Sequence, residues 1–229
     1  MNGAEHLLGA EALARHGARI AFHCEDASVG YAELAERVAR ASGALAALGV
    51  RPGDRILLLL RDTPEFAAAW LAALRAGAVA IGLNTKLSEP EYRYILADSG
   101  ARLAIIEDVF VRARPDLAAE LARENRLVIA GAGAPSWRDA LARARPVPAF
   151  DAPPEHPAFW LYSSGTTGQP KGIIHSHKDV LPAGQVQRGA VAVREHVDGG
   201  QRRVHPLLQR RAGNPEVRRA ERDVVADGR

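Results

Sequence analysis

Hydroxyl, glycine and lysine residues are concentrated in residues 162–172, which read YSSGTTGQPKG. A polyphosphate spreads negative charge over many acceptor oxygens, and hydroxyls, backbone N–H groups and an ammonium can meet that charge together. Glycines in such a loop allow positive φ angles and a close approach of the backbone to a ligand. We therefore predict a phosphate-binding loop with these residues: Ser163, Ser164, Gly165, Thr166, Thr167, Gly168, Lys171 and Gly172.

The order of residues differs from the Walker loop, which places Gly directly before the lysine and Ser or Thr directly after it. Here Pro170 precedes Lys171 and Gly172 follows it. Proline has no N–H donor and a fixed φ, so this loop does not wrap a phosphate onto a helix N-terminus in the Walker manner. A flexible linker is the alternative. The apolar residues 158–162 (AFWLY) instead favour a loop at the end of a buried strand, where α/β proteins bind ligands.

Strand and helix patterns alternate along the first 160 residues. Runs of apolar residues such as 56–60 are typical of strands covered on both faces. Helix starts are indicated by Thr63 before Pro64 and by the capping-box pair Ser88 and Glu91. The expected strands are residues 20–24, 56–60, 79–83, 103–106 and 127–130, and the expected helices are residues 31–48, 64–76, 88–98 and 115–124. Strands that alternate with long helices predict right-handed βαβ units and a mostly parallel sheet.

The hydroxyls, glycines and Pro-Lys-Gly of the loop, followed after four residues by His177, resemble the phosphate loop of the adenylate-forming superfamily. That superfamily comprises acyl- and aryl-CoA ligases, peptide-synthetase adenylation domains and luciferases. Residues 28–60 and 74–105 look like the first segments of acyl-CoA ligases, with a Tyr-x-Glu-Leu helix, a Pro-Gly-Asp turn and a buried strand. Across residues 5–187 the nearest resemblance is to the benzoate-CoA ligase group.

The resemblance implies the N-terminal part of a large adenylate-forming domain, a mostly parallel sheet flanked by helices. It also implies a ligase that uses ATP, Mg²⁺ and coenzyme A to activate a small carboxylic acid, an aryl acid such as benzoate, as acyl-AMP and then as a thioester. The loop would hold the phosphates of ATP. His177 matches a histidine common at the end of this motif, and both ligand contact and a supporting role behind the loop stay open for it.

Several elements that the resemblance implies are not found after Gln187: the acid pocket, the adenine-binding segment, the ribose-binding aspartate and the catalytic lysine of the C-terminal domain. We therefore assign no catalytic residue and expect this N-terminal fragment to be inactive by itself. One alternative is an adenylation domain that loads a carrier protein. Another is a nucleotide-binding module without ligase activity.

The composition changes sharply near Gln187. Residues 1–187 contain 20 Lys and Arg against 21 acids, a net charge of −1, and residues 188–229 contain 10 Arg against 6 acids, a net charge of +4. All 12 aromatic residues precede this point. We therefore predict a partial AMP-binding domain at 1–187 and a non-homologous, disordered Arg-rich tail at 188–229.

Three interpretations of the tail are open: a basic arm that binds nucleic acid, an Arg-rich helix that packs on the domain, and translation in a shifted reading frame. The body is rich in Ala, Arg, Gly and Pro, which suggests a GC-rich gene, and out-of-frame translation of such DNA gives Arg, Gly, Ala, Val and Pro without Lys or aromatics. We favour this third interpretation. Nucleic acid is not an expected partner, because acids interrupt the basic residues and no aromatic side chain could stack on bases.

The lone cysteine, Cys24, rules out an intramolecular disulfide and fits a reducing compartment. No apolar run is long enough to span a bilayer, and the first residues lack the pattern of a secretory signal. We therefore expect a cytoplasmic protein without a membrane span. His175 and His177 alone do not predict a metal site, because no cysteine or third ligand lies near them in sequence.

Overall fold

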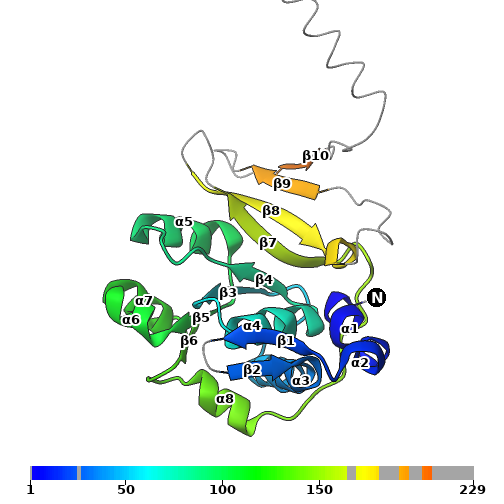
Figure 1. Cartoon of the computed structure of the whole chain (residues 1–229). Coiled ribbons are helices and arrows are strands. Elements are labelled where there is room, and N and C mark those ends of the chain that lie inside the picture. The colour runs from blue at the N-terminus through cyan, green and yellow to red at the C-terminus, as the bar shows by residue number, and fades with distance from the viewer. Residues whose placement is uncertain (1, 25–26, 164–168, 181–190, 196–202, 208–229) are drawn as a thin grey trace, which may run out of the picture.

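The computed structural model describes residues 2–24, 27–163, 169–180, 191–195 and 203–207. Within these residues the main sheet has the strand order β10-β9-β8-β7-β4-β3-β5-β6 (Figure 1). The five strands from β7 to β6 are parallel, and the other three are added antiparallel beyond β7. The strands are β3 (Arg55–Leu59), β4 (Val79–Gly82), β5 (Leu103–Glu107), β6 (Leu127–Ala130), β7 (Pro157–Ser163), β8 (Lys171–Ser176), β9 (Val191–Glu195) and β10 (Arg203–Leu207).

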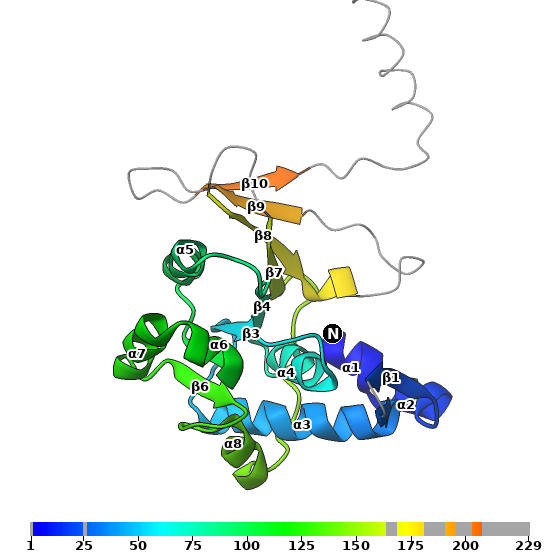
Figure 2. The same ribbon diagram turned by 60° about the vertical axis from the view of Figure 1, so that its left-hand side comes forward.

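Helices cover both faces of the parallel strands (Figures 1 and 2). One face carries α1 (Gly3–Leu8), α3 (Tyr31–Ala47), α4 (Pro64–Arg75) and α8 (Trp137–Arg143), and the other carries α5 (Glu89–Ser99), α6 (Asp108–Ala113) and α7 (Pro115–Arg123). Ile56 and Leu58 of β3 pack into the first core and Leu57 and Leu59 into the second, as alternation along a strand requires. The predicted α/β architecture is confirmed. Among the described helices, none combines the length and apolarity needed to cross a lipid bilayer.

The predicted helix boundaries at α4 and α5 are confirmed by their caps. The Thr63 hydroxyl accepts a hydrogen bond from the Phe66 N–H at 3.5 Å, and Pro64 is the first residue of α4. Ser88 and Glu91 form the capping box of α5. Gly100, which follows α5, has a φ of 54°, the left-handed conformation that glycine adopts without a steric penalty.

The predicted strand at Ile20–Cys24 exists as β1 but lies outside the main sheet. It pairs antiparallel with β2 (Ala27–Gly30), and Ile20 is 51% exposed. The connection between the two strands is two residues long, which suits a hairpin, whereas a parallel pairing needs a crossover of a dozen residues or more. The sequence patterns also missed four short helices: α1, α2 (Ala10–His16), α6 and α8.

Two short strands lie within the predicted Arg-rich tail. β9 pairs antiparallel with β8, with Val193 opposite Ile173, and β10 pairs antiparallel with β9. The backbone of β8 offers an open edge to which a short segment can hydrogen-bond without a core of its own. These ten residues lie within the stretch for which the sequence predicts disorder, and the remainder of 188–229 lies outside the described residues.

Gly43 is expected to be intolerant of substitution although it lies inside a helix. A Cβ atom added to it would lie 1.9 Å from the carbonyl oxygen of Arg145, because the connector after α8 passes directly over α3. An exposed helical glycine gains about 0.5–1 kcal/mol on replacement by alanine. We expect Gly43→Ala to destabilise the protein instead, lowering its unfolding free energy by about 1–3 kcal/mol. Urea unfolding measures this change, and a stabilised variant would show that the close contact is wrong.

Candidate functional site

The predicted phosphate loop connects β7 to β8 at the tip of a hairpin. β7 ends at Ser163, β8 begins at Lys171, and these two residues lie opposite each other in the antiparallel register. Because β7 runs parallel to β4, the loop lies at the carboxyl ends of both strands, where open α/β sheets bind ligands. The structure also describes two further predicted residues: Gly172 lies in β8, and His177 follows directly after β8. The other predicted loop residues lie outside the described residues: Ser164, Gly165, Thr166, Thr167 and Gly168.

A cavity of about 310 Å³ lies beside the two described ends of this loop, Ser163 and Pro170. Its lining combines the two sides of the loop with the end of β4 and the first turns of α5. The lining residues are Gly82, Leu83, Asn84, Leu87, Glu91, Ile95, Tyr162, Ser163 and Pro170. Asn84 was not predicted as a site residue, although its place directly after a predicted strand was a usable signal. The Asn84 carbonyl accepts from the Tyr92 hydroxyl at 2.8 Å, which fixes this wall of the cavity.

Tyr162 fastens the end of β7 to α5. Its hydroxyl donates to the Asp98 carboxylate at 2.6 Å. Its ring also covers Gly172, where an added Cβ atom would lie 3.1 Å from Cζ of Tyr162. Gly172 is not among the described glycines with positive φ, so the expectation of a left-handed conformation is wrong at this residue. Glycine instead suits this position because a side chain there would press against the tyrosine ring, which would have to move by a few tenths of an ångström.

His177 points away from the cavity. Its side chain is buried, and its Nδ1 accepts a hydrogen bond from the N–H of Gly3 at 2.9 Å. Burial and the neighbouring His156 lower the pKa of His177 to about 4, so the imidazole is neutral at physiological pH. This placement favours a supporting role over ligand contact.

His175 is held in a different way. Its ring stacks on Phe159 with centroids 4.5 Å apart, and its Nδ1 lies 4.0 Å from the Asp179 carboxylate. Burial lowers the pKa of His175, and the Asp179 charge opposes that shift. Across the described residues no group of three or more His, Cys, Asp or Glu side chains is arranged to hold a metal ion.

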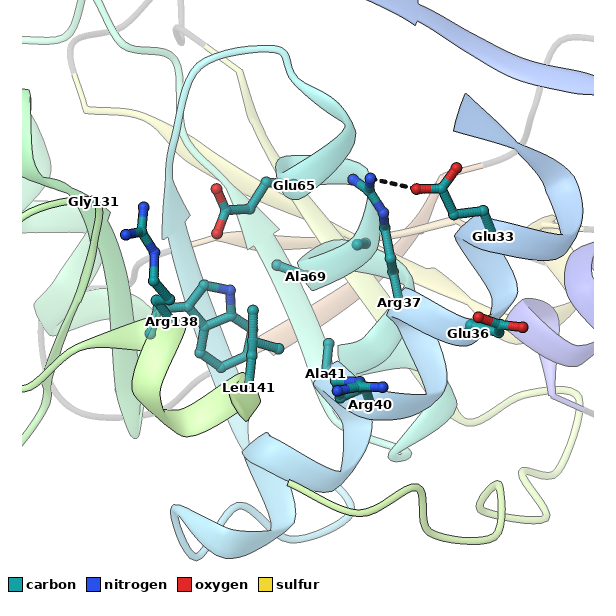
Figure 3. A pocket seen from close by; sticks show the side chains of 12 residues that line it. Glu33, Glu36, Arg37, Arg40, Ala41, Glu65, Ala69, Gly131, Arg138 and Leu141 are labelled. Atoms are coloured by element: carbon teal, nitrogen blue, oxygen red, sulfur yellow. Dashed lines mark hydrogen bonds and ion pairs between the residues drawn. The ribbon is translucent and has the colours of Figure 1, made fainter. Parts of the chain in front are cut away.

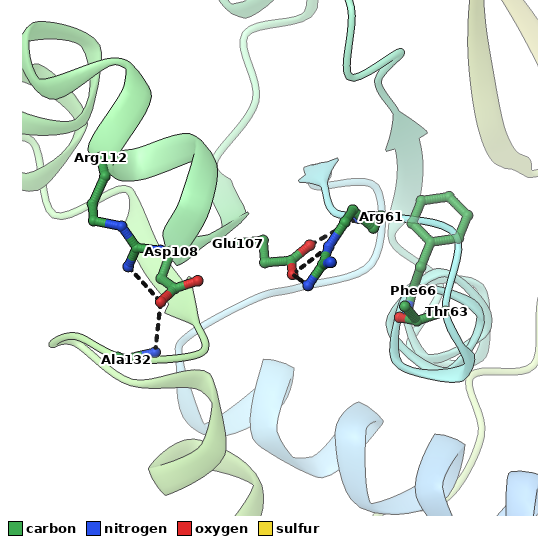
Figure 4. Close-up of polar contacts among 7 residues, drawn as sticks. All are labelled: Arg61, Thr63, Phe66, Glu107, Asp108, Arg112 and Ala132. Carbon is green, nitrogen blue, oxygen red and sulfur yellow. Dashed lines mark hydrogen bonds and ion pairs between the residues drawn. The ribbon is translucent and has the colours of Figure 1, made fainter. Parts of the chain in front are cut away.

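A second polar cluster braces the ends of β3 and β5 (Figure 4). Arg61 donates to the Glu107 carboxylate from its backbone N at 3.0 Å and from Nε at 2.8 Å, and these hydrogen bonds lower the pKa of Glu107. Beside it, Asp108 accepts from Arg112 at 2.6 Å and from the N–H of Ala132 at 3.4 Å. These carboxylates are engaged with protein donors, so the cluster is suited to joining strand ends.

A larger cavity, of about 520 Å³, lies between α3, α4 and α8 (Figure 3). Burial, followed by the charge of Glu107, raises the pKa of Glu65 on its wall. Its charged lining residues are Glu33, Glu36, Glu65, Arg37, Arg40 and Arg138. Three acids balance three arginines, so this cavity has no excess of positive charge for a polyphosphate. The loop between β7 and β8 is therefore the better candidate for phosphate binding.

The fold is that of an α/β protein, and its candidate ligand site lies where β4 and β7 end. A family model described as AMP-binding enzyme matches residues 9–206. The match spans most of the 229 residues, so the chain belongs to the AMP-binding enzyme family. It runs past residue 187, where the composition changes.

Relatives with assigned activities include several acid–CoA ligases. The chain is 37% identical over 194 residues to a 3-hydroxybenzoate–CoA/4-hydroxybenzoate–CoA ligase of Thauera aromatica, covering 82% of this chain and 37% of the relative. It is 37% identical over 200 residues to a benzoate–CoA ligase of the same organism, covering 85% and 38%. A solved benzoate CoA ligase from Burkholderia xenovorans LB400 superposes with a TM-score of 0.67 at 33% identity, covering 77% of this chain and 35% of that one. The chain thus spans somewhat more than a third of the length of these proteins.

Proposed function

We propose that this chain forms the ATP-phosphate-binding part of an ATP-dependent acid–CoA ligase. The observation that carries the proposal is the loop between Ser163 and Lys171, which lies at the carboxyl ends of β4 and β7 beside a cavity. Membership of the AMP-binding enzyme family and the similarity to benzoate–CoA ligases support this function. The similarity also supports an aryl acid such as benzoate as the substrate. A cytoplasmic location is part of the same proposal.

The reaction has two half-reactions. The acid carboxylate attacks the α-phosphorus of ATP, the bond to the bridging oxygen breaks, and pyrophosphate leaves with its electron pair. The thiolate of coenzyme A then attacks the acyl carbon and releases AMP. In the first step the loop hydroxyls, backbone N–H groups and Lys171 would stabilise the charge that builds on the leaving pyrophosphate. Mg²⁺ would bind together with ATP, since it coordinates substrate phosphates in such sites.

The proposed function is tested in a chimeric enzyme in which residues 1–187 replace the corresponding residues of the Thauera aromatica benzoate–CoA ligase. We expect this enzyme to exchange pyrophosphate with ATP when benzoate is present. The unmodified ligase is the positive control, and omission of the acid is the negative control. A chimera that unfolds cooperatively but shows no benzoate-dependent exchange would contradict the proposal. Transfer to a carrier protein in place of coenzyme A would favour the alternative adenylation domain.

A polypeptide of these 229 residues is expected to catalyse neither half-reaction by itself. The described residues contain the strand ends that carry the loop, and the chain spans 37% of the length of a hydroxybenzoate–CoA ligase relative. We propose that the groups that bind adenine, ribose and the acid correspond to the part of this relative that the chain does not span. Pyrophosphate release measured with benzoate and ATP should equal the release without acid. Acid-dependent release above this background would show that the fragment is sufficient.

We also propose a change of reading frame within the tail, and the nucleotide sequence tests it. The composition favours a change near codon 188, whereas the family match extends to residue 206 and favours a position later in the tail. One of the two other frames should therefore continue beyond this region with aromatic residues, lysines and apolar strand patterns. Translation of both frames for several hundred bases checks this expectation. Early stop codons in both frames would instead favour a genuine tail.

A further inference from the structure

The hairpin β7–β8 is attached to the parallel sheet by a short ladder. β7 pairs with β4 at two residue pairs, whereas β3 pairs with β4 at four. A ladder of two pairs does little to fix the tilt of a seven-residue strand. At the loop end, the 2.6 Å hydrogen bond from Tyr162 to Asp98 supplies a second attachment. The opposite end of the hairpin, the base, needs an attachment of its own.

His177 provides this attachment directly after β8. Its ring is 1% exposed, and its Nδ1 accepts a hydrogen bond from the Gly3 N–H at 2.9 Å. Its backbone N–H donates to the His156 carbonyl at 3.0 Å, and the two imidazole rings are stacked with centroids 5.8 Å apart. Nε2 of His156 in turn lies 2.8 Å from the carbonyl oxygen of Gly77, before β4. Figures 1 and 2 both show the turn after β8 beside the N-terminus and α1.

Asn2 holds Gly3 in position. Its side chain is buried at 5% exposure. The two hydrogens of the Asn2 amide nitrogen are shared among three carbonyl oxygens, those of Leu74 (2.9 Å), Arg75 (3.2 Å) and Phe150 (3.0 Å). The Asn2 amide oxygen accepts from the N–H groups of Ala4 (3.0 Å) and Glu5 (3.4 Å). The first residues of the chain are thus fixed to the end of α4 and to the connector before β7.

We propose that Asn2, Gly3 and His177 form an N-terminal latch that sets the orientation of hairpin β7–β8. His177 is then a positioning residue for the loop that begins after Ser163 and ends at Lys171. The latch requires a neutral imidazole, because Nδ1 must keep its lone pair to accept from Gly3. The ring proton is therefore on Nε2, which is buried and has no hydrogen-bond partner among the described residues. The functional consequence of the latch rests on the proposed role of the loop in binding ATP.

Two substitutions separate the hydrogen bond from simple packing. His177→Asn keeps an acceptor oxygen near the position of Nδ1, whereas His177→Leu fills similar space without an acceptor. Amide hydrogen exchange on the full chain reports each strand separately. With His177→Leu we expect exchange in residues 157–163 and 171–178 to become faster by on the order of tenfold, with little change in β3, β5 and β6. His177→Asn should restore most of the protection, and Asn2→Ala should behave like His177→Leu.

Equal acceleration in all strands would overturn the latch, because it would show only a loss of global stability. Equal exchange in His177→Leu and His177→Asn would also overturn it. Mg·ATP added to the chimeric ligase, in which the groups that bind adenine and ribose are present, is a separate arm. If ATP fails to protect residues 157–178 while the variants behave as expected, the proposed ATP-binding role fails and the latch stands.

A measurement without substitutions covers the case in which a variant does not fold. Nitrogen-15 NMR of the histidine rings distinguishes the two neutral tautomers and the charged form. We expect His177 to show the Nε2–H tautomer and to stay neutral at a pH somewhat below 6.5, the usual pKa of a histidine. A His177 ring with its proton on Nδ1 would contradict the hydrogen bond from Gly3 and with it the latch.

Discussion

Replacing Lys171 by alanine in the chimeric ligase is expected to slow acyl-adenylate formation by about 10- to 150-fold, since a hydrogen bond to a charged group contributes about 1.5–3 kcal/mol. Lys171 begins β8 opposite Ser163, so we expect its ammonium to stabilise the leaving pyrophosphate. Thioester formation from preformed acyl-adenylate should be nearly unchanged, because pyrophosphate has already left. Single-turnover assays of the two steps measure this difference.

Lys178→Ala is the matched control for this substitution. Lys178 lies in the turn after β8, and its Nζ is 3.4 Å from the Glu155 carboxylate at the surface. We expect this variant to retain both half-reactions. An equal loss in both steps with Lys171→Ala would contradict the phosphate role and indicate a folding defect. A similar loss with Lys178→Ala would mean that general positive charge, rather than the position of Lys171, sets the rate.

Protonation of His177 is expected to make the protein less stable as the pH is lowered. The pKa of His177 is about 4 in the folded protein because of burial, and its usual value is 6.5. A histidine whose pKa is lowered on folding binds its proton more readily in the unfolded chain, so acid favours unfolding. Its full contribution is present above pH 6.5 and is lost between pH 6.5 and 4. The difference between the two pKa values corresponds to about 3 kcal/mol of unfolding free energy.

Urea unfolding of the unsubstituted chain and of His177→Asn between pH 7 and pH 4 isolates this contribution, because the other titrating groups are shared. We expect the difference in unfolding free energy between the two proteins to shrink as the pH falls. The groups that interact with the His177 charge are His156 and the chain's amino terminus. Parallel pH profiles for the two proteins would contradict a buried neutral imidazole.

Sequence patterns predicted best those elements whose apolar runs and helix caps involve only neighbouring residues. The apolar run of β3 and the capping box of Ser88 and Glu91 each depend on a few neighbouring residues, and both are confirmed. Ile20–Cys24 has the composition of a strand, but its own pattern does not say that it pairs antiparallel with the next segment of the chain. Short helices such as α8 gain stability from packing on α3 and carry little periodic signal.

In the candidate site, too, the local features were predicted and the long-range contacts were not. Ser163, Lys171 and Gly172 were predicted from residue types and spacing, and the structure places them around the tip of one hairpin. The contact of Gly172 with the Tyr162 ring, and the hydrogen bond from Gly3 to His177, join residues that are distant in sequence. No local pattern contains such contacts. They follow from the pairing of β7 with both β4 and β8, which is a property of the folded chain.

Affinity labelling of the lysines tests the phosphate-binding loop most directly. The chain contains three lysines, Lys86, Lys171 and Lys178. An ATP analogue with a pyridoxal aldehyde at its terminal phosphate forms a Schiff base with a nearby amine, and borohydride makes the bond permanent. Peptide mapping should find the label on Lys171, with labelling suppressed by excess Mg·ATP and unaffected by AMP. Equal labelling of all three lysines, or labelling of Lys171 that ATP does not suppress, would contradict the proposed site.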